Sequence, residues 1–531
     1  MATVAVYDAG VSRRSWQDWL GIAGLALALL LALRLIVTAW PFTTDDAYIS
    51  LRYARSLADG QGLRFNPGEP PLEGYSNFLF VLIGAAVLRP GGDPVLALKL
   101  AGCAGLLATL VGLYGLARRV LGPAGAASAP LLFGTLVGGP LWGVSGLETT
   151  VYAALVTGAV LAYLGGAGWG PWEKARQGAP SPSLWALAGG LAFLASLARC
   201  EGPLVFAALA VAAAVDLWRR WRAGGPSPAA ARPHLALVLA FSLPYVAYSA
   251  WRVATFGSLL PNSVLCKAHW QGDPWVLHRD LVADAWPLLL LALVAIARWP
   301  PRLDARLGLP LGFFALYAVI LRGADPIIGY GERHFLASLA LLAVVAAVGL
   351  VRLVSGLSRF WIPARREVVA LALAALLAVA LQPRLGRELL AQARLYARRS
   401  ETRAALGDWL KDRLRPGEAY VVGDAGLLPY RAGGRALDAL CLNSREMTRP
   451  PIDFSAERWA QWALAQRPRF VLIPSHDPRR FQPHLQPAYP TLTDLVRDPS
   501  FRARYRVAAV FATPEDDFNY FVFEASGPPA E

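Results

Sequence analysis

Long apolar runs alternate with short polar segments through the first 383 residues of the chain. A helix of about 20 apolar residues crosses the hydrocarbon core of a bilayer, so these runs predict membrane-spanning helices. Glycine and alanine are frequent in them, which is typical of helices that pack closely in lipid. The runs cover residues 18–40, 76–90, 95–117, 124–142, 147–166, 184–200, 203–218, 233–252, 282–298, 307–321, 334–351 and 367–382.

Arginine clusters predict which ends of these helices face the cytoplasm, because cytoplasmic loops of membrane proteins are enriched in Lys and Arg. The basic segments are 172–182, 219–232, 298–306 and 352–366. Alternation then places the other loops, which are 41–75, 143–147, 253–281 and 322–333, on the opposite side together with everything after residue 383.

About eleven membrane crossings are consistent with the charge pattern at both ends of the chain, which places the N-terminus in the cytoplasm and the C-terminus outside. The first run is expected to be a retained signal-anchor, and the shortest run, 76–90, to be re-entrant or interfacial. Six arginines between Arg384 and Arg403 do not fit, since they follow the last run on the side predicted to be poor in basic residues.

Beyond Gln382 the apolar runs become short. Residues 386–413 predict an amphipathic helix, and β-rich runs at 418–424, 469–474, 504–511 and 518–524 alternate with helical and turn-like stretches. The expected architecture is a polytopic α-helical membrane domain, 1–383, followed by a soluble C-terminal α/β domain, 384–531. That second domain is long enough to bury a core of its own.

Composition supports a membrane protein and argues against nucleic-acid binding. Hydrophobic residues make up 55% and charged residues 17% of the 531 positions, and the mean hydropathy is +0.40, which is too apolar for an ordinary soluble protein. The formal net charge of +14 comes from arginines clustered between apolar runs. Four widely spaced cysteines predict neither a zinc site nor a disulfide framework, although they leave a single pair open.

The most informative polar stretch follows the first apolar run and contains the adjacent carboxylates Asp45 and Asp46. Thr44 is a good N-cap and Gly60 a plausible stop, so we expect a helix over 45–59, lying on the outer membrane face. Two aspartates in a first helical turn also simply complement the helix dipole. Their nearness to the bilayer and the long loop that they open, rich in Gly, Asn, Tyr and Pro, favour a functional role.

Other loops predicted on the same side carry isolated ionisable or polar groups next to apolar runs. Singly, each is explained as a helix-end or loop charge exposed to water, but ionisable groups near lipid are costly and often functional. They are Glu148, Arg199, Glu201, Asn262, Lys267, Asp325, Glu332, Arg333 and His334.

Several motifs resemble the GT-C glycosyltransferases, and among them the arabinofuranosyltransferases that use decaprenyl-phospho-arabinose. The resemblance is most specific in the first loop, in the motif from Asp45 to Arg55 and in Glu73-Gly-Tyr-Ser-Asn77. Ser145-Gly-Leu-Glu-Thr149, the Arg-x-Glu-Gly step at 199–202, Leu259-Leu-Pro-Asn262 and Gly423-Asp-Ala-Gly-Leu-Leu-Pro-Tyr430 extend it along the chain. Gly323-Ala-Asp325 departs from the pattern, where a second glycine is expected. A flagellar-motor-control family shares the opening motif.

The resemblance implies a polyprenyl-phosphate sugar donor that enters from the bilayer and an aspartate of the first external loop as general base. We expect Asp45 to be the base and Asp46 to orient it or help hold a divalent ion, with the reverse order open. Lys267, Arg333 and Arg52 are the expected phosphate ligands. The expected substrate-binding residues are Glu73, Tyr75, Glu148, Glu201, Asn262, Asp325 and His334. Mg²⁺ or Mn²⁺ could bind through carboxylate oxygens, but no residue pattern demands a metal. His476 and Asp477 are read as a turn.

Together with the charge pattern, the resemblance implies an inverting glycosyltransferase of the bacterial cytoplasmic membrane with its active site and C-terminal domain outside. Its partners would be membrane lipids, the lipid-linked donor (with arabinofuranose one candidate sugar) and an envelope glycan or glycolipid acceptor. One alternative is a polytopic lipid or sugar transporter, which would place charges at mid-membrane rather than at helix ends. The other is a non-enzymatic envelope or motor-associated membrane protein, which would have no use for the aspartate pair.

Overall fold

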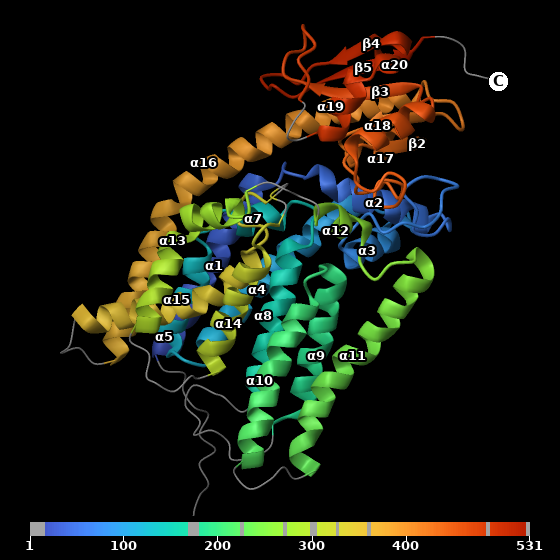
Figure 1. The fold of residues 1–531 in the computed structure, drawn as a ribbon. Helices are drawn as coiled ribbons and strands as arrows, with labels where there is room; N and C mark the ends of the chain where they lie inside the picture. Colours follow the sequence, from blue (N-terminus) through green and yellow to red (C-terminus); the bar gives the residue numbers. More distant parts are fainter. Residues whose placement is uncertain are drawn as a thin grey trace, which may run out of the picture.

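The computed structural model describes residues 16–167, 180–222, 228–268, 273–297, 305–324, 326, 329–357, 363–484 and 489–526. Figure 1 shows a body of long helices with a small mixed α/β domain at one end. The predicted polytopic helical protein with a C-terminal α/β domain is therefore confirmed as the fold class.

Long apolar helices build the body. Seven described helices are long and apolar enough to cross a membrane: α1 (Trp16–Ala39), α4 (Pro94–Ala117), α8 (Thr149–Gly166), α11 (Pro228–Phe256), α13 (Val276–Ala297), α15 (Leu336–Leu357) and α16 (Pro363–Lys411). The body also contains α3 (Phe78–Leu88), α9 (Pro182–Ala198), α10 (Pro203–Arg222) and α14 (Ala305–Ile320). The predicted number of about eleven crossings stays a prediction. Helix α15 is the centre of the bundle, because every residue from Leu336 to Leu350 is buried.

The helix expected over 124–142 is wrong. This stretch forms three short buried helices, α5 (Pro123–Ala126), α6 (Ser128–Phe133) and α7 (Gly138–Gly143). Proline lacks the backbone N–H that a helix interior needs, and two prolines, Pro130 and Pro140, with intervening glycines break the run. The short helices pack against α1, α4, α15 and α16 instead of crossing the bundle.

The basic helix ends lie at the end of the body away from the α/β domain. Figure 1 shows the C-terminus of α10, the C-terminus of α15 and the start of α16 at this lower end, and Arg219, Arg220 and Arg222 close α10. The first loop and α12 (Asn262–Lys267) lie at the opposite end, under the α/β domain. This distribution agrees with the two sides predicted from charge.

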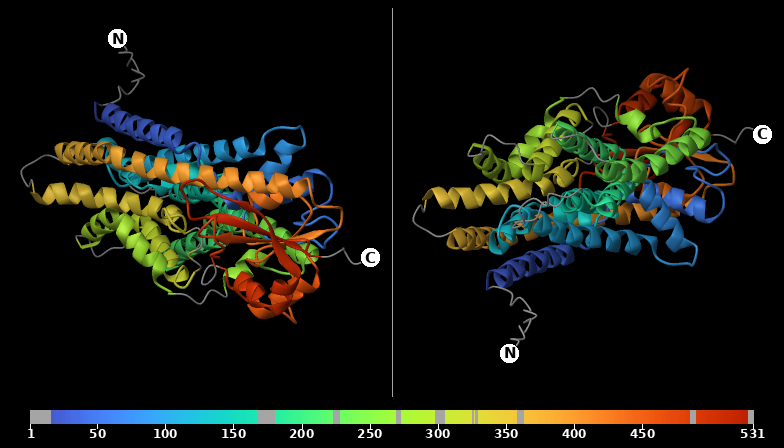
Figure 2. Two further views of the ribbon diagram at one scale, coloured as in Figure 1. Left: turned by 90° about the horizontal axis from the view of Figure 1, so that it is seen from above. Right: turned by 90° about the horizontal axis from the view of Figure 1, so that it is seen from below.

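One continuous helix connects the two parts. Helix α16 runs from the body into the α/β domain with Pro383 in its interior, so the predicted boundary at 383/384 falls inside a helix. Figure 2 shows α16 beside α1 and α15, which both pack against it.

A five-stranded sheet forms the α/β domain, in the order β2-β1-β3-β5-β4. Its strands are β1 (Ala419–Val422), β2 (Arg435–Asp438), β3 (Phe470–Ser475), β4 (Tyr505–Phe511) and β5 (Asn519–Ala525). Strands β2, β1 and β3 are parallel, whereas β5 runs antiparallel to β3 and β4. The four predicted β-rich runs correspond to β1, β3, β4 and β5. The other helices are α17 (Leu427–Ala432), α18 (Ala456–Ala465), α19 (Pro490–Arg497) and α20 (Pro499–Arg504).

Strands β1, β2, β3 and β5 are mostly buried, whereas the edge strand β4 is largely exposed. Alternate residues of the buried strands enter two different cores. Val421 and Ile473 pack with the helices α18 and α19. Tyr420 and Leu472 pack on the other face with α16, α17 and the first loop, including Tyr53 of α2 (Asp45–Ala58). The first loop and the α/β domain therefore share one hydrophobic core.

Candidate active site

A cavity of about 270 Å³ lies where α2, α12 and α16 meet the α/β domain. Part of its wall is polar, and charged side chains of both signs reach it from four segments that are far apart in the sequence. They are Asp45, Asp46, Lys267, Arg399, Arg403 and Asp424.

Asp45 is bound to the α/β domain. The backbone N–H of Gly426 donates to its Oδ2 (3.1 Å) and that of Leu427 to its Oδ1 (3.0 Å), while Arg403 Nε lies 3.7 Å from Oδ1. A Cβ atom at position 426 would lie 2.0 Å from the Asp45 carbonyl oxygen, so this contact requires glycine. Burial raises the pKa of Asp45 to about 6, and the charge of Arg403 opposes this rise.

Asp46 differs from its neighbour although both begin α2. Successive helical residues point about 100° apart, and the Asp46 carboxylate accepts no hydrogen bond from any residue that the structure describes. Burial raises the pKa of Asp46, and the positive charges of Lys267 and Arg333 offset part of the rise. Asp46 thus has a carboxylate available to a bound molecule and two cations close enough to affect it.

Arg333 is a buried cation with two side-chain nitrogens that lack a hydrogen-bond partner. Its side chain is 8% exposed, and its Nη2 lies 3.7 Å from Glu148 Oε1. Its Nε and Nη1 have no hydrogen-bond partner among the described residues, and the guanidinium lies 5.1 Å from the centre of the Trp142 ring. Buried donors are normally satisfied, and a planar guanidinium suits carboxylate or phosphate oxygens, so these two N–H groups keep Arg333 a candidate anion-binding residue. Lys267, at the end of α12, forms no ion pair with the described part of the chain and lines the cavity.

A buried ionic network lies beside Arg333. Glu148 accepts hydrogen bonds from Asn77 Nδ2 (2.9 Å) and Arg199 Nη1 (3.1 Å), and Arg199 also binds Glu201 through two nitrogens, at 2.7 and 3.3 Å. Although burial opposes it, the charge of Arg199 lowers the pKa of Glu201 to about 2. His334 Nδ1 lies 3.4 Å from Arg199 Nη2. The structure therefore brings Glu148, Glu201 and His334 together around one arginine.

Of the expected site residues that the structure describes, Asp45, Asp46 and Lys267 line the cavity; Arg52 and Asn262 are among those that do not. Arg52 is buried and donates to the carbonyl oxygens of Phe65 (2.6 Å), Gly434 (2.8 Å) and Pro429, so its donors are already used. Asn262 Nδ2 donates to the carbonyl oxygens of Cys441 and Leu442, both at 3.0 Å. These two side chains hold the first loop and α12 against the α/β domain.

Glu73 and Tyr75 belong to the core of the first loop. Glu73 Oε2 lies 2.9 Å from Arg252 Nε, and its Oε1 accepts from the Tyr248 hydroxyl (3.4 Å). The Tyr75 ring stacks on Phe78 at a centroid distance of 6.0 Å. Asp325 lies outside the described residues.

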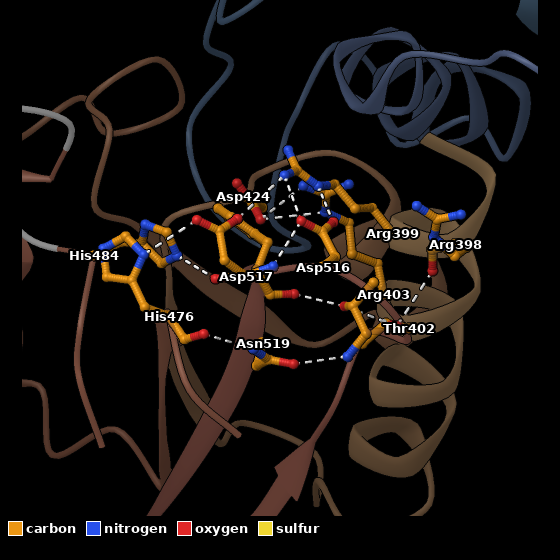
Figure 3. A network of polar contacts seen from close by, with 12 residues as sticks. Arg398, Arg399, Thr402, Arg403, Asp424, His476, His484, Asp516, Asp517 and Asn519 are labelled. Atoms are coloured by element: carbon orange, nitrogen blue, oxygen red, sulfur yellow. Dashed lines mark hydrogen bonds and ion pairs between the residues drawn. The ribbon is translucent and has the colours of Figure 1, made fainter. Parts of the chain in front are cut away.

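Sequence reasoning missed the residues that the α/β domain and α16 contribute. Arg403 lies 3.2 Å from Asp424 Oδ2, which also accepts from the Tyr520 hydroxyl, and Tyr489 donates to Asp424 Oδ1 (3.2 Å). Arg399 binds Asp516 with both Nε and Nη2 (Figure 3). The signal was present in the sequence, because these are two of the arginines on the side expected to lack them, and their i, i+4 spacing puts them on one helix face.

A disulfide between Cys266 and Cys441 joins α12 to the α/β domain next to Lys267. This is the single pair that the cysteine spacing left open. Both cysteines line the cavity, so the covalent bond fixes the segment that carries Lys267 against the domain that closes the cavity.

The structure predicts that Asp45→Ala loosens the α/β domain. The amides of Gly426 and Leu427 lose a charged acceptor, and hydrogen bonds to a charged group contribute roughly 1.5–3 kcal/mol each. Hydrogen exchange of the 424–432 amides in the purified protein is expected to accelerate. Asp59→Ala, an exposed aspartate at the other end of α2, is the control; equal exchange in both variants would contradict the anchoring role.

A divalent cation at the aspartate pair stays a prediction. Asp45 is held by backbone amides and Asp424 by two tyrosines and Arg403, so Asp46 is the carboxylate that could hold Mg²⁺ or Mn²⁺ with oxygens of a bound phosphate. The chain's own cations, Lys267 and Arg333, are in place without it.

Three solved structures have a similar fold over most of this chain. ArnT from Cupriavidus metallidurans, bound to undecaprenyl phosphate, matches with a TM-score of 0.59 at 15% identity, covering 97% of this chain and 100% of that one. The archaeal oligosaccharyltransferase AglB from Archaeoglobus fulgidus, in complex with an inhibitory peptide and a dolichol-phosphate, matches with 0.56 at 13%, covering 86% and 70%. The mycobacterial arabinofuranosyltransferase AftD matches with 0.51 at 18%, covering 97% and 40%.

The chain has the GT-C fold. Among sequence relatives, a terminal β-(1→2)-arabinofuranosyltransferase of Mycobacterium tuberculosis is 30% identical over 250 residues, which are 44% of this chain and 35% of the relative. The chain thus spans about a third of that relative's length. Residues 391–523 match a domain of unknown function (DUF8728). The resemblance to GT-C proteins read from the first loop is confirmed by the fold, and the likeness to an arabinofuranosyltransferase by a sequence relative.

Proposed function

We propose that this chain is an inverting glycosyltransferase that moves a sugar from a polyprenyl-phosphate donor to a hydroxyl of an envelope glycan or glycolipid. The observation that carries the proposal is an uncommitted carboxylate, Asp46, which lines the cavity together with Lys267 and on which the charges of two cations, Lys267 and Arg333, act. The fold supports it, since ArnT and AglB of the same fold were solved with polyprenyl or dolichol phosphate.

The proposed reaction is a single displacement at the anomeric carbon. Asp46 takes the proton of the acceptor hydroxyl, the hydroxyl oxygen forms the new bond to the anomeric carbon, and the bond from that carbon to the phosphate oxygen breaks with its electrons staying on phosphate. Phosphate leaves as a stable anion, so no general acid is required. Arg333 and Lys267 stabilise the charge that develops on it.

Asp46 replaces Asp45 as our candidate base. The Asp45 oxygens each receive a backbone N–H, which fits a residue that docks the α/β domain over the cavity. The Asp46 pKa is raised by burial, which makes its carboxylate a stronger proton acceptor than an exposed aspartate.

The proposed location is a bacterial cytoplasmic membrane with the cavity on the outer side. The apolar helices and the GT-C fold show a multi-pass membrane protein. Two observations support the orientation: the basic helix ends lie opposite the cavity, and the disulfide between Cys266 and Cys441 belongs to an oxidising compartment.

Arabinofuranose is the proposed sugar, on the strength of the sequence relative. Purified protein in lipid nanodiscs is expected to release polyprenyl phosphate from a polyprenyl-phospho-arabinofuranose only when an arabinan-type acceptor is present, as measured by mass spectrometry of both products. A polyprenyl-phospho-hexose is the comparison donor. Turnover of the hexose donor alone would contradict the sugar, and turnover of neither, with either acceptor class, would contradict the enzyme.

A further inference from the structure

Two histidines and an aspartate gather on the α/β domain, beside the cavity and outside the proposed reaction. His476 follows β3, His484 lies eight residues further along the chain, and Asp517 lies in the turn between β4 and β5. One potential ligand atom from each lies within 4.8 Å of the other two. Figure 3 shows the three side chains at the end of the polar network that contains Arg399 and Arg403.

The backbone holds the two imidazoles side by side. The N–H of His476 donates to the carbonyl oxygen of Gln482 (2.8 Å), and the N–H of His484 to that of Pro474 (2.9 Å). Between them, Ser475 and Pro483 form an antiparallel bridge. The two ring centres are 3.4 Å apart, so the loop brings two metal-binding groups together before any ligand arrives.

A neighbouring carbonyl fixes which nitrogen of His484 is available. Nε2 lies 2.7 Å from the backbone oxygen of Asp517, and a carbonyl oxygen only accepts, so Nε2 carries the hydrogen and Nδ1 keeps its lone pair. Metal-binding histidines commonly donate their second N–H to a backbone carbonyl, which orients the ring and raises the basicity of the ligating nitrogen. His476 Nδ1 lies 3.4 Å from Asp517 Oδ2, which places the third ligand beside the pair.

We propose that His476, His484 and Asp517 form a binding site for a divalent transition metal, with Zn²⁺ the best fit. Two imidazole nitrogens and one carboxylate oxygen suit Zn²⁺ better than Mg²⁺ or Ca²⁺, which prefer oxygen ligands alone. His476 and Asp517 are exposed, with 50% and 66% of their side chains accessible, so an ion can enter from solvent and a water can complete the coordination.

The site adjoins the arginine that lines the cavity. Asp517 Oδ1 lies 3.8 Å from Arg399 Nη2, and Asp516, the preceding residue, binds the same guanidinium. A metal held by Asp517 would brace the β4–β5 turn and so fix the carboxylates that orient Arg399.

The test uses the whole 531-residue chain, purified without a polyhistidine tag, stripped with a chelator and dialysed against Zn²⁺. About one zinc ion per chain is expected by plasma mass spectrometry, and Co²⁺ in its place should give the intense visible absorption of a tetrahedral site. His476→Ala/His484→Ala is expected to lose both signals. Glu515→Gln, an exposed carboxylate of the same turn, is the matched control and should keep them.

Hydrogen exchange separates metal binding from a change of fold. Zn²⁺ is expected to slow exchange of the 512–518 amides in the wild type and in Glu515→Gln, and to leave it unchanged in the double-histidine variant. Unchanged zinc content in the double variant, or no zinc in the wild type, would overturn the proposal. A site that binds zinc without protecting residues 512–518 would overturn the bracing of Arg399.

Discussion

Sugar transfer is expected to fall by about 10²- to 10⁴-fold in Asp46→Asn, the usual contribution of a general base. The amide keeps the size and the position of the side chain but cannot take the proton of the acceptor hydroxyl. Lys267 and Arg333 remain in place, so binding of the lipid donor should persist. The measurements are kcat for transfer in nanodiscs and the donor Kd from a titration with a non-transferable analogue.

The pH dependence distinguishes a base from a structural aspartate. Asp46 must be ionised to accept a proton, and its pKa is raised by burial, so wild-type kcat/KM should decline as the pH falls through that raised value. The residual activity of Asp46→Asn should lack this acid limb. Asp45→Asn serves as the comparison and should keep the limb with a smaller loss of rate. The opposite result, with the limb lost only in Asp45→Asn, would return the base to Asp45.

Arg333→Ala is expected to lower kcat/KM for the lipid donor by about 10²- to 10³-fold, comparable to the loss of one preorganised charge-stabilising donor in other enzymes. The reason is the pair of buried N–H groups without partners, which a phosphate would satisfy. Arg333→Lys should recover only part of the loss, because an ammonium group cannot bind two phosphate oxygens through a planar fork.

In Arg333→Ala, Glu148 keeps its other two partners, Arg199 and Asn77. The positive charge of Arg199 therefore still compensates the buried carboxylate. Arg322→Ala is the matched control, since this exposed arginine lies in the same loop and stacks on Trp275 at 4.7 Å. Inhibition by free polyprenyl phosphate should weaken in Arg333→Ala alone. Equal inhibition of the wild type, Arg333→Ala and Arg322→Ala would exclude Arg333 as a phosphate ligand.

Local pattern predicted most of the elements and failed where contacts decide the structure. The helix opened by Asp45 and Asp46 ends at Ala58, before Gly60, which has a φ of +75°, as the expected stop at Gly60 indicated, whereas the Thr44 side chain makes no capping hydrogen bond. The run at 124–142 has the length and hydrophobicity of a membrane span, yet Pro130 and Pro140 break it, and the pieces are stabilised only by packing inside the bundle. Strand β2 has four residues and is recognisable only through its pairing with β1.

The site shows the same division. Chemistry and position relative to the membrane made Asp46, Lys267 and Arg333 candidate site residues, because a charge near lipid is informative by itself; their roles stay predictions. Arg52 and Asn262 have equally suitable side chains, but their donors are used by carbonyls of the α/β domain, which lie more than 170 positions away in sequence. A sequence pattern does not show which carbonyl oxygens accept hydrogen bonds from a given donor. Whether such a residue is free to bind a ligand is therefore known only once the fold is known.

The hydrophobic core shared by the first loop and the α/β domain has a consequence for how this protein can be divided. A fragment starting near residue 391, where the DUF8728 match begins, would start in mid-helix and lose Tyr53, Phe65 and Tyr75, which fill one face of its sheet. Expressed alone, such a fragment is expected to expose this apolar surface to solvent and to aggregate. The C-terminal segment is therefore expected to fold stably only in a chain that also supplies a loop to cover this apolar face of its sheet.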